Sequence, residues 1–400
     1  MAEPTPARTV GVPKESFPAE RRVALVPSAV RPLKKAGLEV LVQSGAGAEA
    51  GFADASYAEQ GARVVSSRAE VFGEANVIAQ VRACGAAGEA GRADVPLLRD
   101  GQILVALCDA LWQPRALVEI AGRKVAIYSL EMMPRTTRAQ SMDVLSSMST
   151  ISGYKSVILA AASLRKMFPM MMTAAGTVQA ARVFVIGAGV AGLQAISTAR
   201  RLGAVVQGYD IRPAAQEQIE SVGGKFVDLG LETKNSEGTG GYARAMNEEF
   251  YRRQREVMAR VVATSDVVIS AAVVLGQKAP VLVTSAMVTG MSPGSIIIDL
   301  AAERGGNCEL TRADEMVVQN GVTILGPTNL PATVPQHASE MFSKNVTAFL
   351  LHVMKDGRPR FDADDEILRE TLVARGGEIV HPQVRELLSR EFTTGVPTGN

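Results

Sequence analysis

The sequence predicts an α/β protein with two Rossmann-like domains, each built on a parallel sheet and separated by a cleft. Three observations support this fold class. Short, fully apolar runs recur along the chain with helical stretches between them, as in strands that are covered on both faces. One run, residues 183–186, enters a glycine-rich turn that continues into a helix. With 400 residues, the chain is long enough for two ordinary domains.

The first domain is predicted from a series of strands that precede residue 145. A helix over residues 28–35 is expected to have Ser28 as its cap and to stop at Gly37. Because helical stretches separate the strands, this region is a β/α domain by itself. The expected strands are residues 9–12, 38–43, 75–81, 103–107 and 125–128.

The second domain is expected to follow an apolar helix over residues 152–167. Its charged helix spans residues 247–263, and a long helix over residues 339–354 would return the chain to the first domain. We therefore predict a discontinuous first domain, residues 1–145 and 328–400, and a continuous second domain, residues 146–327. The tail beyond Pro382 has little apolar content and is expected to be loose. The expected strands of the second domain are residues 183–186, 204–209, 225–227, 266–270, 295–299 and 323–325.

Composition excludes several classes of function. The formal net charge of +1 gives no electrostatic reason to expect nucleic acid or an anionic membrane as a partner. Residues 1–9 lack the apolar core of a signal peptide, and no apolar run reaches membrane-spanning length. The three cysteines are too few and too scattered for a disulfide framework or a zinc site, so we expect reduced core residues of a cytoplasmic protein. They are Cys84, Cys108 and Cys308.

The glycine-rich turn at 187–192 has the Gly-x-Gly-x-x-Gly spacing of a dinucleotide site. Gly187 permits the tight turn, Gly189 lets a pyrophosphate approach the backbone, and Gly192 lets the helix pack closely. Ala188 and Val190 complete the expected cofactor-binding turn, and the helix N-terminus faces the phosphates. The alternative is a glycine-rich turn in another kind of α/β unit.

Asp210 ends the next predicted strand, about 20 residues after the glycines, where a carboxylate accepts from a ribose hydroxyl. This carboxylate would repel a 2′-phosphate, so it favours NAD over NADP. Arg212 lies two residues further and could weaken that preference, or it could be a solvated loop cation.

Residues 229–244 combine charges and glycines with Tyr242, and cannot bury enough apolar surface to order strongly. This segment is either a surface connection or a lid anchored by Tyr242. A second polar segment, residues 134–147, precedes the helix between the domains and should lie at the cleft. It is either a capped helix start or a group that grips a carboxamide, a ribose or a phosphate. Its candidate residues are Arg135, Gln140, Asp143 and Ser146.

Several motifs in order resemble the NAD(H)-binding domain of proton-translocating, Re/Si-specific nicotinamide nucleotide transhydrogenase. The similarity runs from about Val10 to Leu351. The motifs are EMMPR at 131–135, RAQSMD at 138–143, GAGVAGLQ at 187–194, GYA at 241–243, DLAAE at 299–303, GGNC at 305–308 and PTNLP at 327–331.

The resemblance implies a division of roles between the two polar regions. Arg135, Gln140, Asp143 and Ser146 would contact the nicotinamide end of NAD(H) and carry the catalytic positioning. Asp210 would hold the adenosine ribose, and Tyr242 would lie on a closing loop. The resemblance also implies a homodimer that docks onto membrane-spanning and NADP(H)-binding subunits, at the inner face of the cytoplasmic membrane. Because no span is predicted, the chain looks like the separate soluble subunit, with little activity alone.

Alanine dehydrogenase is the sister family and the main alternative, since it shares PKE at 13–15 and RVAL at 22–25. Amino-acid oxidation needs an acid–base group near the reacting carbon. In the relative a histidine serves near the fourth strand, but residues 107–110 here are LCDA, and no histidine precedes His337. We expect His337 to cap a helix or face the cleft, and His352 and His381 to be structural or solvated. Arg22, which could hold a substrate carboxylate in the relative, is expected to be structural or weakly site-facing here.

Hydride transfer between two nicotinamide rings needs orientation rather than a proton donor, which favours the transhydrogenase hypothesis. Glu303 stands where the dehydrogenases carry Asp, and could be a site carboxylate or a loop acceptor. A third hypothesis is a non-catalytic module that senses NADH.

Overall fold

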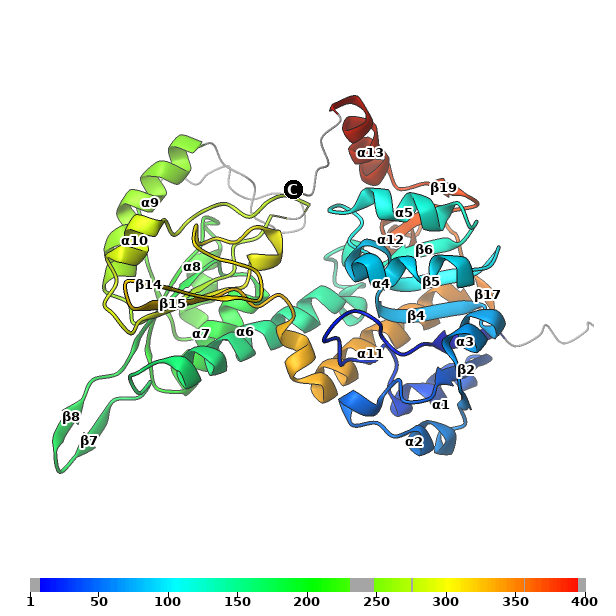
Figure 1. Cartoon of the computed structure of the whole chain (residues 1–400), viewed down its shortest axis with the longest axis horizontal. Coiled ribbons are helices and arrows are strands. Elements are labelled where there is room, and N and C mark those ends of the chain that lie inside the picture. The colour runs from blue at the N-terminus through cyan, green and yellow to red at the C-terminus, as the bar shows by residue number, and fades with distance from the viewer. Residues whose placement is uncertain (1–7, 231–247, 275, 356, 395–400) are drawn as a thin grey trace, which may run out of the picture. The chain divides into compact units, whose positions relative to one another are not determined.

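The computed structural model describes residues 8–230, 248–274, 276–355 and 357–394. The chain forms two compact units (Figure 1). Unit 1 contains residues 1–148 and 331–400, and unit 2 contains residues 149–330.

Unit 1 is a sheet of mostly parallel strands with the order β19-β18-β6-β5-β4-β1-β2-β3. The central strands are apolar and buried, and β4 is buried along its whole length. The chain builds β1, β2 and β3 in one direction and β4, β5 and β6 in the other. The strands are β1 Arg8–Val12, β2 Leu38–Gln43, β3 Arg63–Val65, β4 Val77–Arg82, β5 Ile103–Leu107, β6 Ala126–Ser129, β18 Leu372–Arg375 and β19 Glu378–Ile379, with a separate pair of β16 Met354–Lys355 and β17 Arg358–Pro359.

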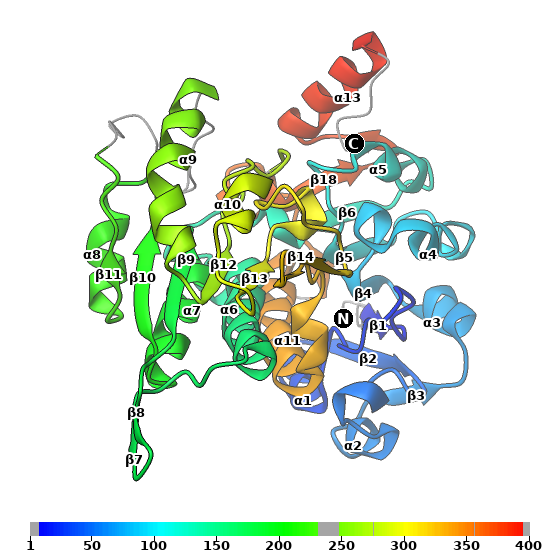
Figure 2. The same ribbon diagram turned by 60° about the vertical axis from the view of Figure 1, so that its left-hand side comes forward.

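Helices lie on both faces of this sheet (Figure 2). They are α1 Pro27–Lys35, α2 Asp54–Glu59, α3 Arg68–Glu74, α4 Gly88–Arg92, α5 Pro114–Ala121, α11 Pro335–Val353, α12 Glu366–Thr371 and α13 Pro382–Thr394. The short 3-10 turns are η1 Ala48–Ala50, η2 Cys84–Ala87, η3 Val95–Leu97, η4 Leu130–Met132, η5 Gln140–Met142 and η8 Leu330–Thr333.

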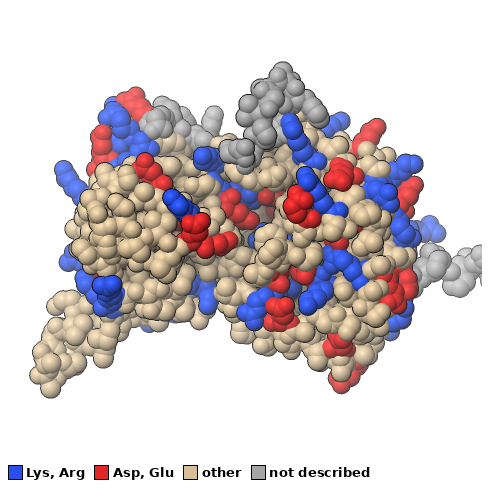
Figure 3. Space-filling view, in the orientation of Figure 1, with Lys and Arg blue, Asp and Glu red and all other residues tan. Residues whose placement is uncertain are grey.

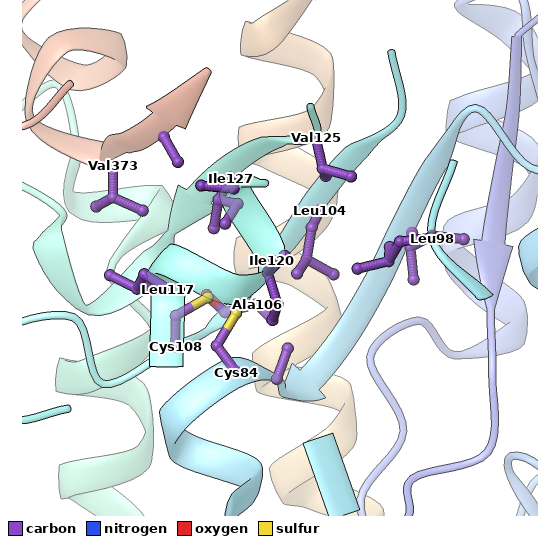
Figure 4. Packing of buried hydrophobic residues seen from close by; sticks show 14 of the residues in the cluster. Cys84, Leu98, Leu104, Ala106, Cys108, Leu117, Ile120, Val125, Ile127 and Val373 are labelled. Atoms are coloured by element: carbon purple, nitrogen blue, oxygen red, sulfur yellow. The ribbon is translucent and has the colours of Figure 1, made fainter. Parts of the chain in front are cut away.

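The core of unit 1 fills the space between the β4–β6 region and the helices beside it. Cys84 and Cys108 lie with their sulfurs close together in this core, among residues such as Leu104 and Ile120 (Figure 4). All three cysteines of the chain are free and buried, as the sequence predicted. Burial raises the pKa of the Cys308 thiol to about 11, which keeps it protonated.

Unit 2 is a second sheet with the order β11-β10-β9-β12-β13-β15-β14. Its strands alternate between two cores, because successive side chains of a strand point to opposite faces. Val183 and Val185 pack into one cluster, and Phe184 and Ile186 pack into the other. The strands are β9 Arg182–Ile186, β10 Val205–Tyr209, β11 Lys225–Phe226, β12 Val267–Ser270, β13 Ile296–Asp299, β14 Met316–Gln319 and β15 Val322–Leu325.

The helices of this unit cover both faces of the sheet, and a hairpin of two short strands extends from it (Figure 1). The hairpin strands are β7 Met171–Thr173 and β8 Gly176–Val178. The helices are α6 Val144–Ser163, which contains the boundary between the units, α7 Val190–Arg201, α8 Ala215–Ser221, α9 Glu248–Ala263, α10 Ser285–Thr289 and the 3-10 turn η7 Ala302–Arg304.

The predicted fold class of two Rossmann-like α/β domains is confirmed, and most predicted strands agree within two residues. Both sheets, however, carry antiparallel strands at an edge. β18 pairs with β6, and β14 pairs with β15, in antiparallel register. These strands were not predicted, because an edge strand lacks the continuous apolar run of a strand that is buried on both faces.

Four local expectations were wrong. Ser28 lies inside the first turn of α1, which begins at Pro27 after an uncapped Val26. The interdomain helix begins at Val144 rather than residue 152 and ends at Ser163. The tail beyond Pro382 is helix α13 and not a loose segment, since Val384 and Leu388, one turn apart, are buried against unit 1. His352 lies in the last turn of α11, not in its middle.

The surface carries no large region of one sign of charge in the view of Figure 3, where acidic and basic side chains are interspersed. This distribution agrees with the formal net charge of +1. Among the residues that the structure describes, no helix is both long enough and apolar enough to span a membrane.

Candidate functional site

The sheet of unit 2 places a crevice at the carboxyl ends of β9 and β12. From β9 the chain builds β10 and β11 on one side, and β12, β13 and β15 on the other. In sheets of this kind, ligands bind where the strand order reverses, outside the carboxyl ends. The glycine-rich turn begins at this position, directly after β9.

The three glycines are required for different reasons. Gly187 has a φ of +92°, and a Cβ there would meet the backbone of Ala271, which follows β12. A Cβ at Gly192 would overlap the carbonyl oxygen of Gly187, so only glycine lets α7 begin this close to the turn. Gly189, by contrast, has no atom within 4 Å of a built Cβ. The turn is therefore closed on the protein side at Gly187 and Gly192 and open at Gly189, as a pyrophosphate requires.

Asp210 follows β10 and faces the turn. Its carboxylate accepts a hydrogen bond from Ala188 N at 2.7 Å and one from Arg212 N at 2.9 Å. The Arg212 side chain donates through Nε at 2.9 Å and through Nη2 at 2.8 Å. Arg212 is thus an ion-pair partner of Asp210 and not a solvated loop cation, which was one of the two alternatives.

A buried polar network holds the opposite wall of the crevice. Asp299, at the end of β13, accepts from Ser270 Oγ at 3.0 Å, Cys308 N at 2.9 Å and Thr311 Oγ1 at 2.7 Å. Asn307 donates to the carbonyls of Ala272 and Pro280 and accepts from Ala272 N. These bonds fix the segment after β12 against which Gly187 packs.

The second predicted group lies in unit 1, at the start of α6. Asp143 precedes the helix and accepts from Ser146 N at 2.9 Å and Ser146 Oγ at 2.5 Å, which is the geometry of a helix N-cap. Arg135 and Gln140 are exposed on the preceding segment. The structure therefore brings Asp143 and Ser146 together, and Ala188, Asp210 and Arg212 together in unit 2.

The segment before α6 is anchored by two later helices of unit 1. Asn345 of α11 donates to the carbonyl of Ser141 at 2.8 Å. Arg138 pairs with Asp365 at 2.8 Å, and His352 lies 3.0 Å from the same carboxylate. Burial alone would raise the pKa of Asp365, but His352 and Arg138 hold it below its ordinary value. This anchoring gives the exposed side chains of Arg135 and Gln140 a fixed base.

Other candidates are placed as follows. Tyr242 lies outside the described residues. Glu303 is exposed in η7, and His337 is exposed in the first turn of α11. His381 is buried at 3% exposure, where burial lowers its pKa, so it is structural rather than solvated.

A second crevice was missed by sequence reasoning. In unit 1 the strand order reverses between β1 and β4, and charged side chains fill that position. Glu15 accepts from Val81 N at 2.7 Å and Arg82 N at 3.2 Å. Arg22 donates to Glu20 through Nε at 2.7 Å and Nη2 at 2.6 Å, with exposures of 2% and 0%. Arg22 is thus structural, which was the first of the two expectations for it.

The missed cluster has a distinct electrostatic character. Arg82 lies 3.5 Å from Glu20 and its guanidinium stacks on Phe17. Burial, with the nearby Glu20 charge, raises the pKa of Glu15 to about 8. The sequence signal was weak, since only the acid–x–Arg spacing at 20–22 is visible, and Arg82 is 60 positions away.

The fold and the glycine-lined crevice define unit 2 as a Rossmann-type nucleotide-binding domain of the oxidoreductase class. The open space at Gly189 and the acceptor at Asp210 fit the pyrophosphate and ribose of a dinucleotide. No atom of the described turn blocks this fit.

Comparison with known proteins gives the family. The description "Alanine dehydrogenase/PNT, N-terminal domain" matches residues 11–152, and the matching C-terminal domain covers residues 156–382. The chain belongs to the alanine dehydrogenase/PNT family, as its motifs predicted.

Similar relatives include transhydrogenase subunits. An NAD(P) transhydrogenase alpha subunit of Rhodospirillum rubrum is 46% identical over 376 residues, or 93% of this chain and 98% of that protein. A solved transhydrogenase from Sinorhizobium meliloti is 39% identical with a TM-score of 0.80, covering 94% of this chain and 99% of that one. A solved L-alanine dehydrogenase is 26% identical with a TM-score of 0.79, covering 96% and 99%. The similarity supports an oxidoreductase component of the transhydrogenase type that works with other subunits.

Proposed function

We propose that this chain binds NAD(H) and presents it for direct hydride exchange with NADP(H) on a partner subunit, coupled to proton translocation through membrane-spanning subunits. The observation that carries the proposal is the glycine-lined crevice of unit 2 with Asp210 at its side, in a chain 46% identical to a transhydrogenase alpha subunit. When bound, the nicotinamide ring supplies the hydride chemistry. The chain's own residues bind and orient it.

The proposed roles follow the chemistry of each side chain. Gln140 can both donate to and accept from a carboxamide, so it would orient the nicotinamide. Arg135 and Asp143 would position the ring and its ribose. Ser146, bonded to the Asp143 carboxylate, would keep that group in place. Tyr242 would exclude water as its loop closes.

The test is Gln140→Asn in the complex reconstituted with the NADP(H)-binding and membrane fractions of the same source. Shortening the side chain moves the amide by one methylene, and we expect hydride exchange to fall at least about tenfold because orientation is lost. NADH affinity should stay within about threefold, since most binding contacts remain. The matched control is Gln383→Asn, an exposed glutamine of α13. Unchanged exchange in Gln140→Asn would remove this residue from the mechanism.

An alanine dehydrogenase-like activity is the second candidate, on the evidence of the shared fold. It would need a proton donor at the substrate carbon. At the end of β5 the chain instead has the buried Cys108, beside which the Glu131 carboxylate accepts from Cys108 N and Ala110 N. Robust turnover of NAD with L-alanine by the purified chain would reject the transhydrogenase proposal. A sensing module predicts no exchange when the partner subunits are added.

A homodimer belongs to the same proposal, and the β7–β8 hairpin supports it. Met170, Met171 and Met172 are exposed, with Met172 at 82%. Residues 167–181 carry no charge, which is visible on the hairpin in Figure 3. Beside it, a groove of about 710 Å³ is lined by Arg165, Lys166 and Val178. Contiguous exposed apolar surface of this kind marks a protein interface. Sedimentation of the purified chain as a monomer at micromolar concentration would contradict the dimer.

A further inference from the structure

The Asp210 carboxylate already uses its hydrogen-bonding capacity. It accepts four hydrogen bonds, one from Ala188 N and three from Arg212. A carboxylate offers about four lone-pair positions on its two oxygens. Any further donor, such as a ribose hydroxyl, must therefore replace one of these four.

The four bonds differ in how readily they can be replaced. The donors Ala188 N and Arg212 N belong to the backbone, and they can leave only if the turn itself changes. The donors Nε and Nη2 belong to the Arg212 side chain, which is 14% exposed and can rotate away. The guanidinium therefore occupies the acceptor positions that the hydroxyls of an adenosine ribose would take.

A displaced Arg212 guanidinium stays close to its original partner, because only one residue separates it from Asp210. A 2′-phosphate on the ribose would meet the Asp210 carboxylate as a repulsive neighbour. It would also meet a planar guanidinium, whose forked donors match phosphate oxygens. An arginine near the acid at the end of the second strand is the known means of accepting this phosphate.

Resting on the proposed function, we propose that Arg212 is the specificity-determining residue of this site. It competes with the ribose hydroxyls of NAD(H) for Asp210, and it binds the 2′-phosphate of a nucleotide that carries one. The discrimination between the two nucleotides is then set by the pair rather than by Asp210 alone. Removal of the guanidinium should shift the two affinities in opposite directions.

The experiment measures binding by calorimetry, with adenosine 5′-phosphate, adenosine 2′,5′-bisphosphate, NADH and NADPH as ligands. In Arg212→Met, NADH and adenosine 5′-phosphate should bind about fivefold more tightly, since a partly exposed ion pair no longer has to open. The bisphosphate and NADPH should bind at least about tenfold more weakly. A soak of the wild-type protein with NADH should show the guanidinium moved off Asp210.

Matched variants separate the outcomes. Arg201→Met, an exposed arginine at the end of α7, should change neither affinity. Arg212→Lys keeps the charge without the fork and should fall between wild type and Arg212→Met, which also serves if the latter folds poorly. Weaker NADH binding in Arg212→Met, or an unchanged ratio of the two nucleotides, would overturn the inference alone. Wild-type protein that binds none of the four ligands would overturn the proposed function as well.

Discussion

The two sheets of this protein carry the same acid–x–arginine pair at the crevice where their strand order reverses. In unit 1, Glu20 accepts from the backbone N, the Nε and the Nη2 of Arg22. In unit 2, Asp210 accepts from the same three donors of Arg212. The bonding pattern is shared, but the surroundings are not.

The difference lies in what shares the crevice with each pair. Glu20 and Arg22 are enclosed by Arg82 and Glu15, and their side chains are almost inaccessible to solvent. Asp210 faces a glycine-lined turn that leaves open space at Gly189. The same local motif is therefore a structural plug in one sheet and an exchangeable ligand contact in the other. Topology provides two candidate sites, and the residues at each crevice decide which one can bind a nucleotide.

The largest expected effect comes from the glycines that distinguish the crevice of unit 2. Gly192→Ala forces a Cβ into the carbonyl of Gly187, so the free energy of unfolding should fall by about 3 kcal/mol. Gly189→Ala meets no atom within 4 Å and should change stability by less than about 1 kcal/mol. Both should weaken NADH binding at least about tenfold, as measured by calorimetry. The Gly192→Ala clash distorts the turn, and the methyl group that Gly189→Ala adds would stand where the pyrophosphate approaches.

The control is Gly73→Ala in α3 of unit 1. Its φ is not in the left-handed region, and no atom lies within 4 Å of a built Cβ. Neither NADH affinity nor stability should fall in this variant. If Gly189→Ala binds NADH as tightly as the wild type, the nucleotide does not use this crevice.

A smaller effect should separate the two acid–arginine pairs. Arg22→Met removes one partner of a buried ion pair, and should lower the free energy of unfolding by about 3 kcal/mol or slightly less, because Arg82 still lies near Glu20. Arg212→Met should cost about 1 kcal/mol or less, since that pair is partly exposed. The single tryptophan, Trp112, lies in unit 1, so its fluorescence during urea unfolding reports on that unit. Equal shifts in both variants would mean that the two pairs are equivalent.

The sequence predicted those features that depend on local pattern. The buried parallel strands appear as continuous apolar runs, and the turn at 187–192 shows its spacing directly. Edge strands such as β14 are exposed and lack that pattern. Helix α13 was missed because Val384 and Leu388 are the apolar minority of a polar segment, and their burial depends on contact with distant residues.

The charge cluster of unit 1 was missed for the same reason. Glu15 receives its bonds from β4, more than 60 residues away, and Arg82 reaches Glu20 only once β1 and β4 are adjacent. Spacing alone could suggest that Arg212 lies near Asp210, but not that its side chain fills two acceptor positions. Long-range pairing creates these contacts, so local sequence carries little sign of them.

The smallest expected difference is a pH dependence that belongs to unit 1. The pKa of Glu15 is raised from 4.5 to about 8 by burial and by Glu20. Between these values the unfolded chain ionises while the folded one stays protonated, so this contribution to stability is complete below pH 4.5 and is lost as the pH rises through about 8. In Glu15→Gln the Trp112 unfolding transition should lose this slope, by an amount on the order of 1 kcal/mol between about pH 6 and 9.

The slope is the readout rather than the level, because the amide cannot accept from Val81 N and Arg82 N as the carboxylate does. Glu119→Gln, an exposed residue of α5, is the control and should keep the wild-type slope. A slope that persists in Glu15→Gln would place the titrating group elsewhere in unit 1, and the enclosed charge cluster would then not distinguish this crevice from the open one of unit 2.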